Sequence, residues 1–209
     1  MTRYQLEHGA ALRVAATLLL SRWTLSDRIA ADYVVRGAVL FDLAAAGHLD
    51  RDGCTTTLTG GATGSAPFDS FLEGLSQNGD VDPWTAVHSL RAVGLESVLD
   101  HAVAAAPHPF AVSRSPRTRR ARVRAGMRHL HDHPPVSPAD PRSTVMRSAV
   151  DILSTAARMQ DHALRPTRPQ LHQLGDLAWT VELTLTCLRE LSSFRLHRDR
   201  ANSGEDDRC

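Results

Sequence analysis

The segment VVRGAVLFDLAAAGHLD, residues 34–50, is apolar at nearly every position, so no solvent-facing stripe can be drawn along it. A helix that is apolar on all sides is buried inside a bundle or inserted in a membrane. This one is shorter than the roughly 20 apolar residues that a bilayer span needs. The segment therefore predicts a helix buried in the core of a helical bundle, ending at Gly47, a residue type favoured just past helix C-termini.

Arg36 is the one basic residue in this apolar helix. A guanidinium does not lose its charge in a protein. We therefore expect Arg36 either to reach the surface at the end of the helix or to meet an anion.

The composition limits the class of protein. Hydrophobic residues make up 42% of the chain and aromatic residues 5%, so the core must consist of Leu, Val and Ala. All 24 basic residues are Arg, and the formal net charge of +1 favours no particular partner. Cys54, Cys187 and Cys209 are far apart, which is typical of a reduced, cytosolic protein without a disulfide framework or zinc site.

The pattern along the chain predicts a mainly α fold: a single globular helical domain over residues 1–194 around the buried apolar helix, with one or two small β-hairpins. Asp52-Gly53 predicts a hairpin turn, Asp82-Pro83 a helix start, and residues 195–209 a disordered polar tail. No segment is apolar enough to span a membrane, and the apolar N-terminal run is interpreted as a core helix, not a signal peptide. The predicted helices cover residues 5–22, 28–46, 68–75, 83–93, 95–106, 142–159 and 171–194.

No constellation of residues indicates catalysis. The alternating histidines His129, His131 and His133 invite a metal hypothesis, but no further ligand is spaced to complete a shell, so solvated loop histidines are favoured. No nucleophile elbow of the GxSxG type is present. We expect a protein that is not an enzyme and that needs no metal or other cofactor.

The strongest electrostatic feature is the segment 114–128, called here the arginine segment, which contains no acidic residue. Such a run attracts anionic lipid headgroups or nucleic-acid phosphates. A flexible, solvated loop without a ligand is the plain alternative. Aromatic residues between the arginines would favour nucleic acid, and only Phe110 lies nearby, so a lipid surface is preferred. The arginines are Arg114, Arg117, Arg119, Arg120, Arg122, Arg124 and Arg128.

Residues 34–106 resemble the Golgi phosphoprotein 3 family, in its shorter bacterial branch. The segment from Arg36-Gly37 to Leu49 is similar to the family's buried RGxxLxxLAxxGxL helix. Thr63-Gly64 through Asp69 resembles its TGDxxLDxxL segment, with Ser65 in place of the acid. Trp84 with Leu90-Arg91 resembles the following WxxxL helix, and Asp140-Pro141-Arg142-Ser143 the segment before a late core helix.

This resemblance implies a helical domain with a projecting hairpin that binds phosphatidylinositol 4-phosphate and acts as a peripheral membrane adaptor in the cytoplasm. It implies that Arg36 is the headgroup-binding arginine, with Arg91 in the second basic element. The arginine segment, including Arg114, Arg117, Arg119, Arg120, Arg122 and Arg124, would then form a basic membrane or anion patch.

The expected partner is thus an anionic phospholipid (phosphoinositide) membrane surface. Two alternatives stay open. The first is a nucleic-acid-binding or regulatory module that uses the arginine segment, with nucleic acid the less favoured partner. The second is a scaffold that uses its basic loop to contact an acidic protein or a second copy of itself.

Overall fold

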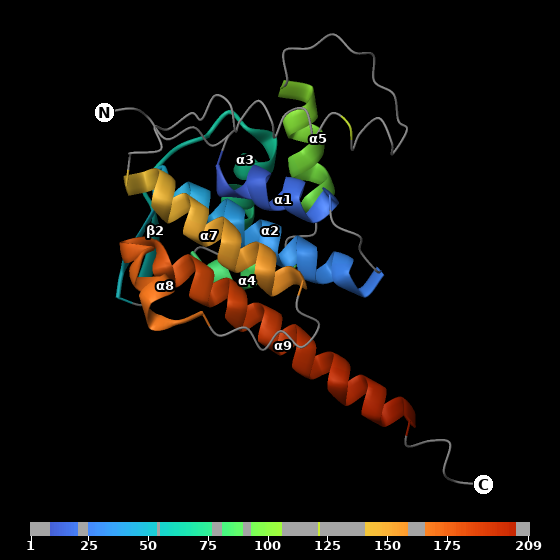
Figure 1. Ribbon diagram of the computed structural model, residues 1–209. Coiled ribbons are helices and arrows are strands. Elements are labelled where there is room, and N and C mark those ends of the chain that lie inside the picture. Colours follow the sequence, from blue (N-terminus) through green and yellow to red (C-terminus); the bar gives the residue numbers. More distant parts are fainter. Residues whose placement is uncertain are drawn as a thin grey trace, which may run out of the picture.

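Helices dominate the computed structural model, as the sequence predicts (Figure 1). The structure describes residues 9–20, 25–53, 55–76, 81–89, 93–105, 121, 141–158 and 166–203. In these ranges the elements are α1 (Ala10–Leu20), α2 (Leu25–Ala45), β1 (Leu49–Asp52), β2 (Thr55–Leu58), α3 (Ala66–Ser76), α4 (Pro83–Ser89), α5 (Leu95–Ala105), α7 (Pro141–Arg158), α8 (Arg168–His172), the 3-10 helix η2 (Gly175–Leu177) and α9 (Ala178–Ser203).

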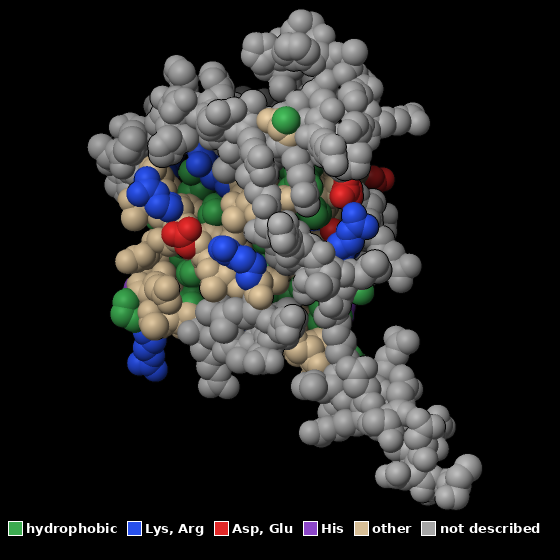
Figure 2. All heavy atoms as spheres, turned by 45° about the vertical axis from the view of Figure 1, so that its right-hand side comes forward, with side chains coloured by type: hydrophobic (Ala, Val, Ile, Leu, Met, Phe, Trp, Pro, Cys, Tyr) green, Lys and Arg blue, Asp and Glu red, His purple; other side chains and the backbone are tan. Residues whose placement is uncertain are grey.

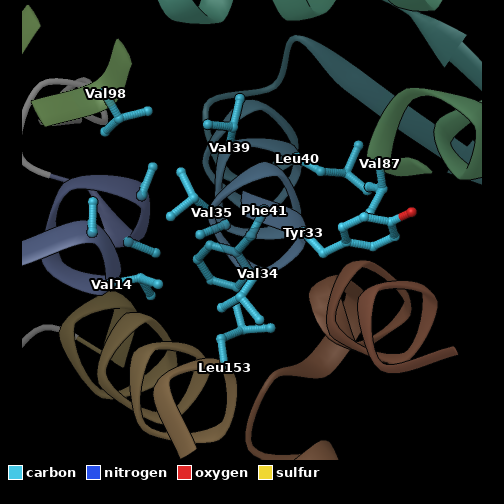
Figure 3. Packing of buried hydrophobic residues seen from close by; sticks show 14 of the residues in the cluster. Val14, Tyr33, Val34, Val35, Val39, Leu40, Phe41, Val87, Val98 and Leu153 are labelled. Carbon is cyan, nitrogen blue, oxygen red and sulfur yellow. The ribbon is translucent and has the colours of Figure 1, made fainter. Parts of the chain in front are cut away.

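The 21-residue helix α2 runs through the middle of the bundle and is the buried apolar helix that the sequence predicts. It contacts α1, α4, α5, α7 and α9, which surround it in the close view of the core (Figure 3). From Val34 to Leu43 it has no exposed position. Its neighbours supply residues such as Val14 of α1 and Leu153 of α7, both fully buried. The all-round apolar character of the segment is therefore explained by neighbours on all sides.

Gly37 allows α9 to approach the backbone of α2 closely. A Cβ atom built at Gly37 would overlap the side chain of Thr184. The Thr184 hydroxyl is itself held, because it donates a hydrogen bond to the Thr180 carbonyl at 2.7 Å. The glycine of the Arg36-Gly37 pair is thus a packing residue at a helix crossing.

Asp42 is a fully buried acid that fastens the start of α1 to α2. Its carboxylate accepts hydrogen bonds from the Ala10 amide at 2.7 Å and from the Ala11 amide at 2.8 Å. These amides are among those that a helix leaves unpaired at its N-terminus, and the negative charge also suits the positive end of the helix dipole. Asp42 therefore holds two helices together across 32 residues of sequence.

The hairpin has the predicted turn. Strands β1 and β2 are antiparallel, with Leu49 opposite Leu58 and Asp52 opposite Thr55. Gly53 lies in the turn at φ 58°, and Gly47 ends α2 at φ 79°. Both angles are in the left-handed region that glycine adopts without steric cost.

The C-terminal part of the chain differs from the prediction. A single helix from residue 171 was expected, but Gly175, at φ 54°, separates α8 from α9. A disordered tail was expected from residue 195, whereas α9 continues to Ser203 in the structure. The helix projects away from the body there (Figure 1), and Phe194 is 70% exposed. Residues 204–209 lie outside the described part of the chain.

The described surface carries mixed charges. In the face shown in Figure 2, arginine and acidic side chains are scattered singly, with hydrophobic side chains visible only in small groups. No helix in the described ranges has both the length and the apolar character to cross a bilayer.

Candidate functional site

Arg36 lies inside the protein, where α2 meets the end of α4 and the start of α5. Its side chain is only 5% exposed. Its Nε atom donates a hydrogen bond to the Val93 carbonyl at 2.6 Å, and Nη1 donates to the Val87 carbonyl at 3.1 Å and to the His88 carbonyl at 3.4 Å. The guanidinium also lies over the ring of Tyr33, 5.5 Å from the ring centre.

These contacts explain how a permanent charge is tolerated at a buried position. The carbonyls of Val87 and His88 belong to the last turn of α4, where carbonyl groups have no partner within the helix and where the helix dipole favours a cation. Arg36 thus acts as a cap for α4 and ties it to the chain just before α5. Of the two alternatives expected for Arg36, a position at the surface is wrong, because the side chain is buried, and backbone carbonyls are among its partners.

His88 joins three helices beside Arg36. Its Nδ1 atom lies 2.7 Å from the Tyr33 hydroxyl of α2. On the other side of the ring, Nε2 lies 3.8 Å from the Glu190 carboxylate of α9. The ring of Trp84 lies against His88 at 4.6 Å between ring centres. Trp84 itself is 39% exposed.

The N-terminus of α5, next to this cluster, is occupied by a carboxylate of the chain itself. The Leu95 amide donates to Asp32 Oδ1 at 2.9 Å, and the Gly94 amide donates to the Ser97 hydroxyl at 3.0 Å. A Cβ atom built at Gly94 would overlap the Asp32 carboxylate. Asp32 therefore uses one of the amides that could otherwise bind an external anion.

The segment from Thr63 to Asp69 forms a structural turn before α3. The Asp69 carboxylate accepts hydrogen bonds from the Thr63 amide at 2.6 Å, from the Thr63 hydroxyl at 2.7 Å and from the Gly64 amide at 3.2 Å. Desolvation raises the pKa of Asp69, but these hydrogen bonds and the nearby His48 outweigh it and leave the pKa lowered. The resemblance segment TGxxxxD, residues 63–69, is accounted for by this turn.

A serine and a histidine meet behind the same turn. The Ser65 hydroxyl lies 3.0 Å from Nε2 of His101 on α5. Ser65 is buried, so a substrate has no access to its hydroxyl. The pair connects the start of α3 with α5 and does not form a nucleophile that a substrate could reach.

Several predicted site residues lie outside the described residues. They are Arg91, the arginine segment with Arg114, Arg117, Arg119, Arg120, Arg122 and Arg124, and the histidines His129, His131 and His133. In the part of the chain that the structure describes, no group of three His, Cys, Asp or Glu side chains is arranged to hold a metal ion. Burial, together with the negative charges of Glu190 and Asp82, raises the pKa of the Cys187 thiol to about 12.

The roles of His88, Asp32 and Asp42 were not predicted from the sequence. His88 is partly exposed, and its partners come from α2 and α9, far away in the sequence. For Asp42 a signal was present: a lone acid between Phe41 and Leu43 in an apolar helix must have a partner, by the same reasoning that was applied to Arg36.

The fold and this cluster define a mainly helical domain with one small hairpin and a buried, carbonyl-bound arginine at the junction of three helices. Compared with known proteins, the chain matches no protein-family model, no curated protein and no solved structure.

Proposed function

We propose that this chain is a non-enzymatic, peripheral membrane protein of the cytoplasm that binds anionic phospholipid surfaces through the arginine segment. One observation carries the proposal: seven arginines without a single acid over residues 114–128. A basic residue near an anionic membrane surface contributes about 1 kcal/mol. On the face that Figure 2 shows, arginine and acidic side chains are mixed, whereas the arginine segment concentrates positive charge.

The family resemblance suggests a finer proposal: recognition of phosphatidylinositol 4-phosphate and a role as an adaptor. The contacts of Arg36 support a positioning role in this proposal. Arg36 binds the Val93 carbonyl, two residues beyond Arg91, so it fixes the backbone that follows Arg91. Its Nε and Nη1 atoms already donate to backbone carbonyls and do not support direct binding of a headgroup.

Vesicle co-sedimentation tests the charge-based part. The test variant changes four arginines of the segment to Gln, and the control changes four exposed arginines of the described helices to Gln. Because each arginine contributes about 1 kcal/mol, the test variant should bind phosphatidylserine vesicles roughly 100- to 1,000-fold more weakly. The control variant should lose far less of its affinity for the vesicles. The test set is Arg117, Arg119, Arg120 and Arg122, and the control set is Arg147, Arg158, Arg168 and Arg189.

The outcomes separate the proposals. Equal losses in the two variants, or no binding by the wild type, contradict binding through the arginine segment. Vesicles with phosphatidylinositol 4-phosphate and with phosphatidylserine, at equal surface charge, test the finer proposal, because a charge-only mechanism gives equal binding to both. If the wild type shifts duplex DNA at physiological salt and binds no vesicle, the nucleic-acid alternative replaces the lipid proposal.

A further inference from the structure

The ring of His88 has one satisfied and one unsatisfied nitrogen. Nδ1 pairs with the Tyr33 hydroxyl, whereas Nε2 is buried and has no hydrogen-bond partner. The nearest carboxylate oxygen, Oε2 of Glu190, is 3.8 Å away, which is too long for a hydrogen bond. A neutral imidazole has one donor and one acceptor nitrogen, and a protonated one has two donors. Protonation thus gives Nε2 a charged N–H directed at a carboxylate.

Glu190 occupies a particular place on α9. The helix is buried against the body as far as Leu188, and Ser193 and Phe194 are exposed. Glu190 is therefore at the base of the projecting part of α9 that Figure 1 shows. A contact between His88 and Glu190 fixes that base to α4.

Within the described part of the chain, α2 and α9 bring charged or titratable groups to His88. From α2, Arg36 opposes a second cation, and Tyr33 can accept a hydrogen bond from Nδ1. From α9, the Glu190 carboxylate favours a cation, and it also acts with Asp82 on the neutral Cys187 thiol. On α3, which packs against α4, Asp69 is engaged by Thr63 and Gly64, and Glu73 is exposed.

A positive charge on the ring would lie between the Glu190 carboxylate and the C-terminal end of α4, and both interact favourably with a cation. Arg36 opposes it, but three backbone carbonyls already bind that guanidinium.

We propose that His88 and Glu190 form a pH-sensitive clasp, in which protonation of His88 closes the 3.8 Å gap and fastens the base of the projecting part of α9 to α4. The clasp is independent of what the arginine segment binds. The base of the projecting part of α9 is therefore held more strongly against α4 in acidic than in alkaline solution.

Thermal unfolding of the full chain at pH 5.5 and pH 8 tests the clasp. The variant Glu190→Gln removes the carboxylate and keeps the side-chain size, and Glu182→Gln is the matched control at an exposed position of α9. We expect Glu190→Gln to lower the unfolding midpoint by roughly 2–4 °C more at pH 5.5 than at pH 8. Glu182→Gln should show no such difference.

A second variant tests the partner. In a His88→Gln background the extra effect of Glu190→Gln at pH 5.5 should disappear, because the titrating ring is gone. If His88→Gln does not fold, hydrogen exchange of α9 replaces the double-variant experiment, with exchange rates corrected for the intrinsic effect of pH. Protection of residues 189–194 should then be lower in Glu190→Gln than in the wild type at pH 5.5, and equal in the two at pH 8. Equal effects of Glu190→Gln at both pH values, or the same pH dependence in Glu182→Gln, overturn the clasp.

Discussion

Replacing Arg36 by Met tests whether this buried arginine holds the fold together. Met keeps much of the side-chain volume but leaves the carbonyls of Val87, His88 and Val93 without their donor. A hydrogen bond to a charged group contributes about 1.5–3 kcal/mol. The contact to His88 is long, so two of the three bonds dominate. We expect Arg36→Met to lower the free energy of unfolding by about 3–5 kcal/mol, which is the combined contribution of the two shorter hydrogen bonds.

Urea denaturation followed by circular dichroism measures this loss, and Arg28→Met is the control on the same helix. Arg28 lies 3.9 Å from Glu96, and their side chains are 67% and 53% exposed. Such a surface pair contributes about 1 kcal/mol or less. Arg36→Lys keeps the charge but lacks the forked guanidinium that reaches both α4 and Val93. Its loss of unfolding free energy should therefore lie between those of Arg36→Met and Arg28→Met.

The reasoning is refuted if Arg36→Met and Arg28→Met differ by less than about 1 kcal/mol. A stable Arg36→Met that no longer binds phosphatidylinositol 4-phosphate vesicles would instead make Arg36 a direct ligand, as the family resemblance implies.

Three further predictions concern packing, acid stability and thiol reactivity. Gly37→Ala should cost about 1–3 kcal/mol of stability by overlap with Thr184, and Thr184→Ala should recover part of it in urea denaturation of the double variant. Because the folded-state pKa of Asp69 is below 3.8, its stabilising effect is present above that pH and is lost as the pH falls through the folded value. The difference in unfolding midpoint between wild type and Asp69→Asn should therefore shrink below about pH 4. With Cys54 and Cys209 changed to Ser, native Cys187 should react with a thiol reagent at pH 8 at least about 1,000-fold more slowly than the urea-unfolded chain.

Local signals in the sequence were sufficient for many of the elements. Gly47 and Gly53 adopt the left-handed conformations that their positions predict. The Asp82-Pro83 start of α4 is confirmed, since Asp82 accepts a hydrogen bond from the Trp84 amide at 3.0 Å. In each case the contacts that determine the local structure join residues only a few positions apart, so the local sequence is sufficient to predict them.

The contacts that form the candidate site are not local. Arg36 binds carbonyls 51, 52 and 57 residues further along the chain. The sequence indicates that Arg36 and Asp42 each need a polar partner, but it does not identify the partners. Those partners lie on α4 and α1, and only the topology of the fold brings these helices against α2.

The close crossing at Gly37 has a consequence for synthesis of the chain. On the ribosome, the face of α2 that accepts Thr184 is made well before α9. Chains emerge at about 5–20 residues per second, so this apolar face waits for several seconds before its partner exists. During that time α1 can already dock on α2 through Asp42, but the α9 side stays bare. Chaperones that shield hydrophobic surface should therefore matter most between the completion of α2 and the completion of α9.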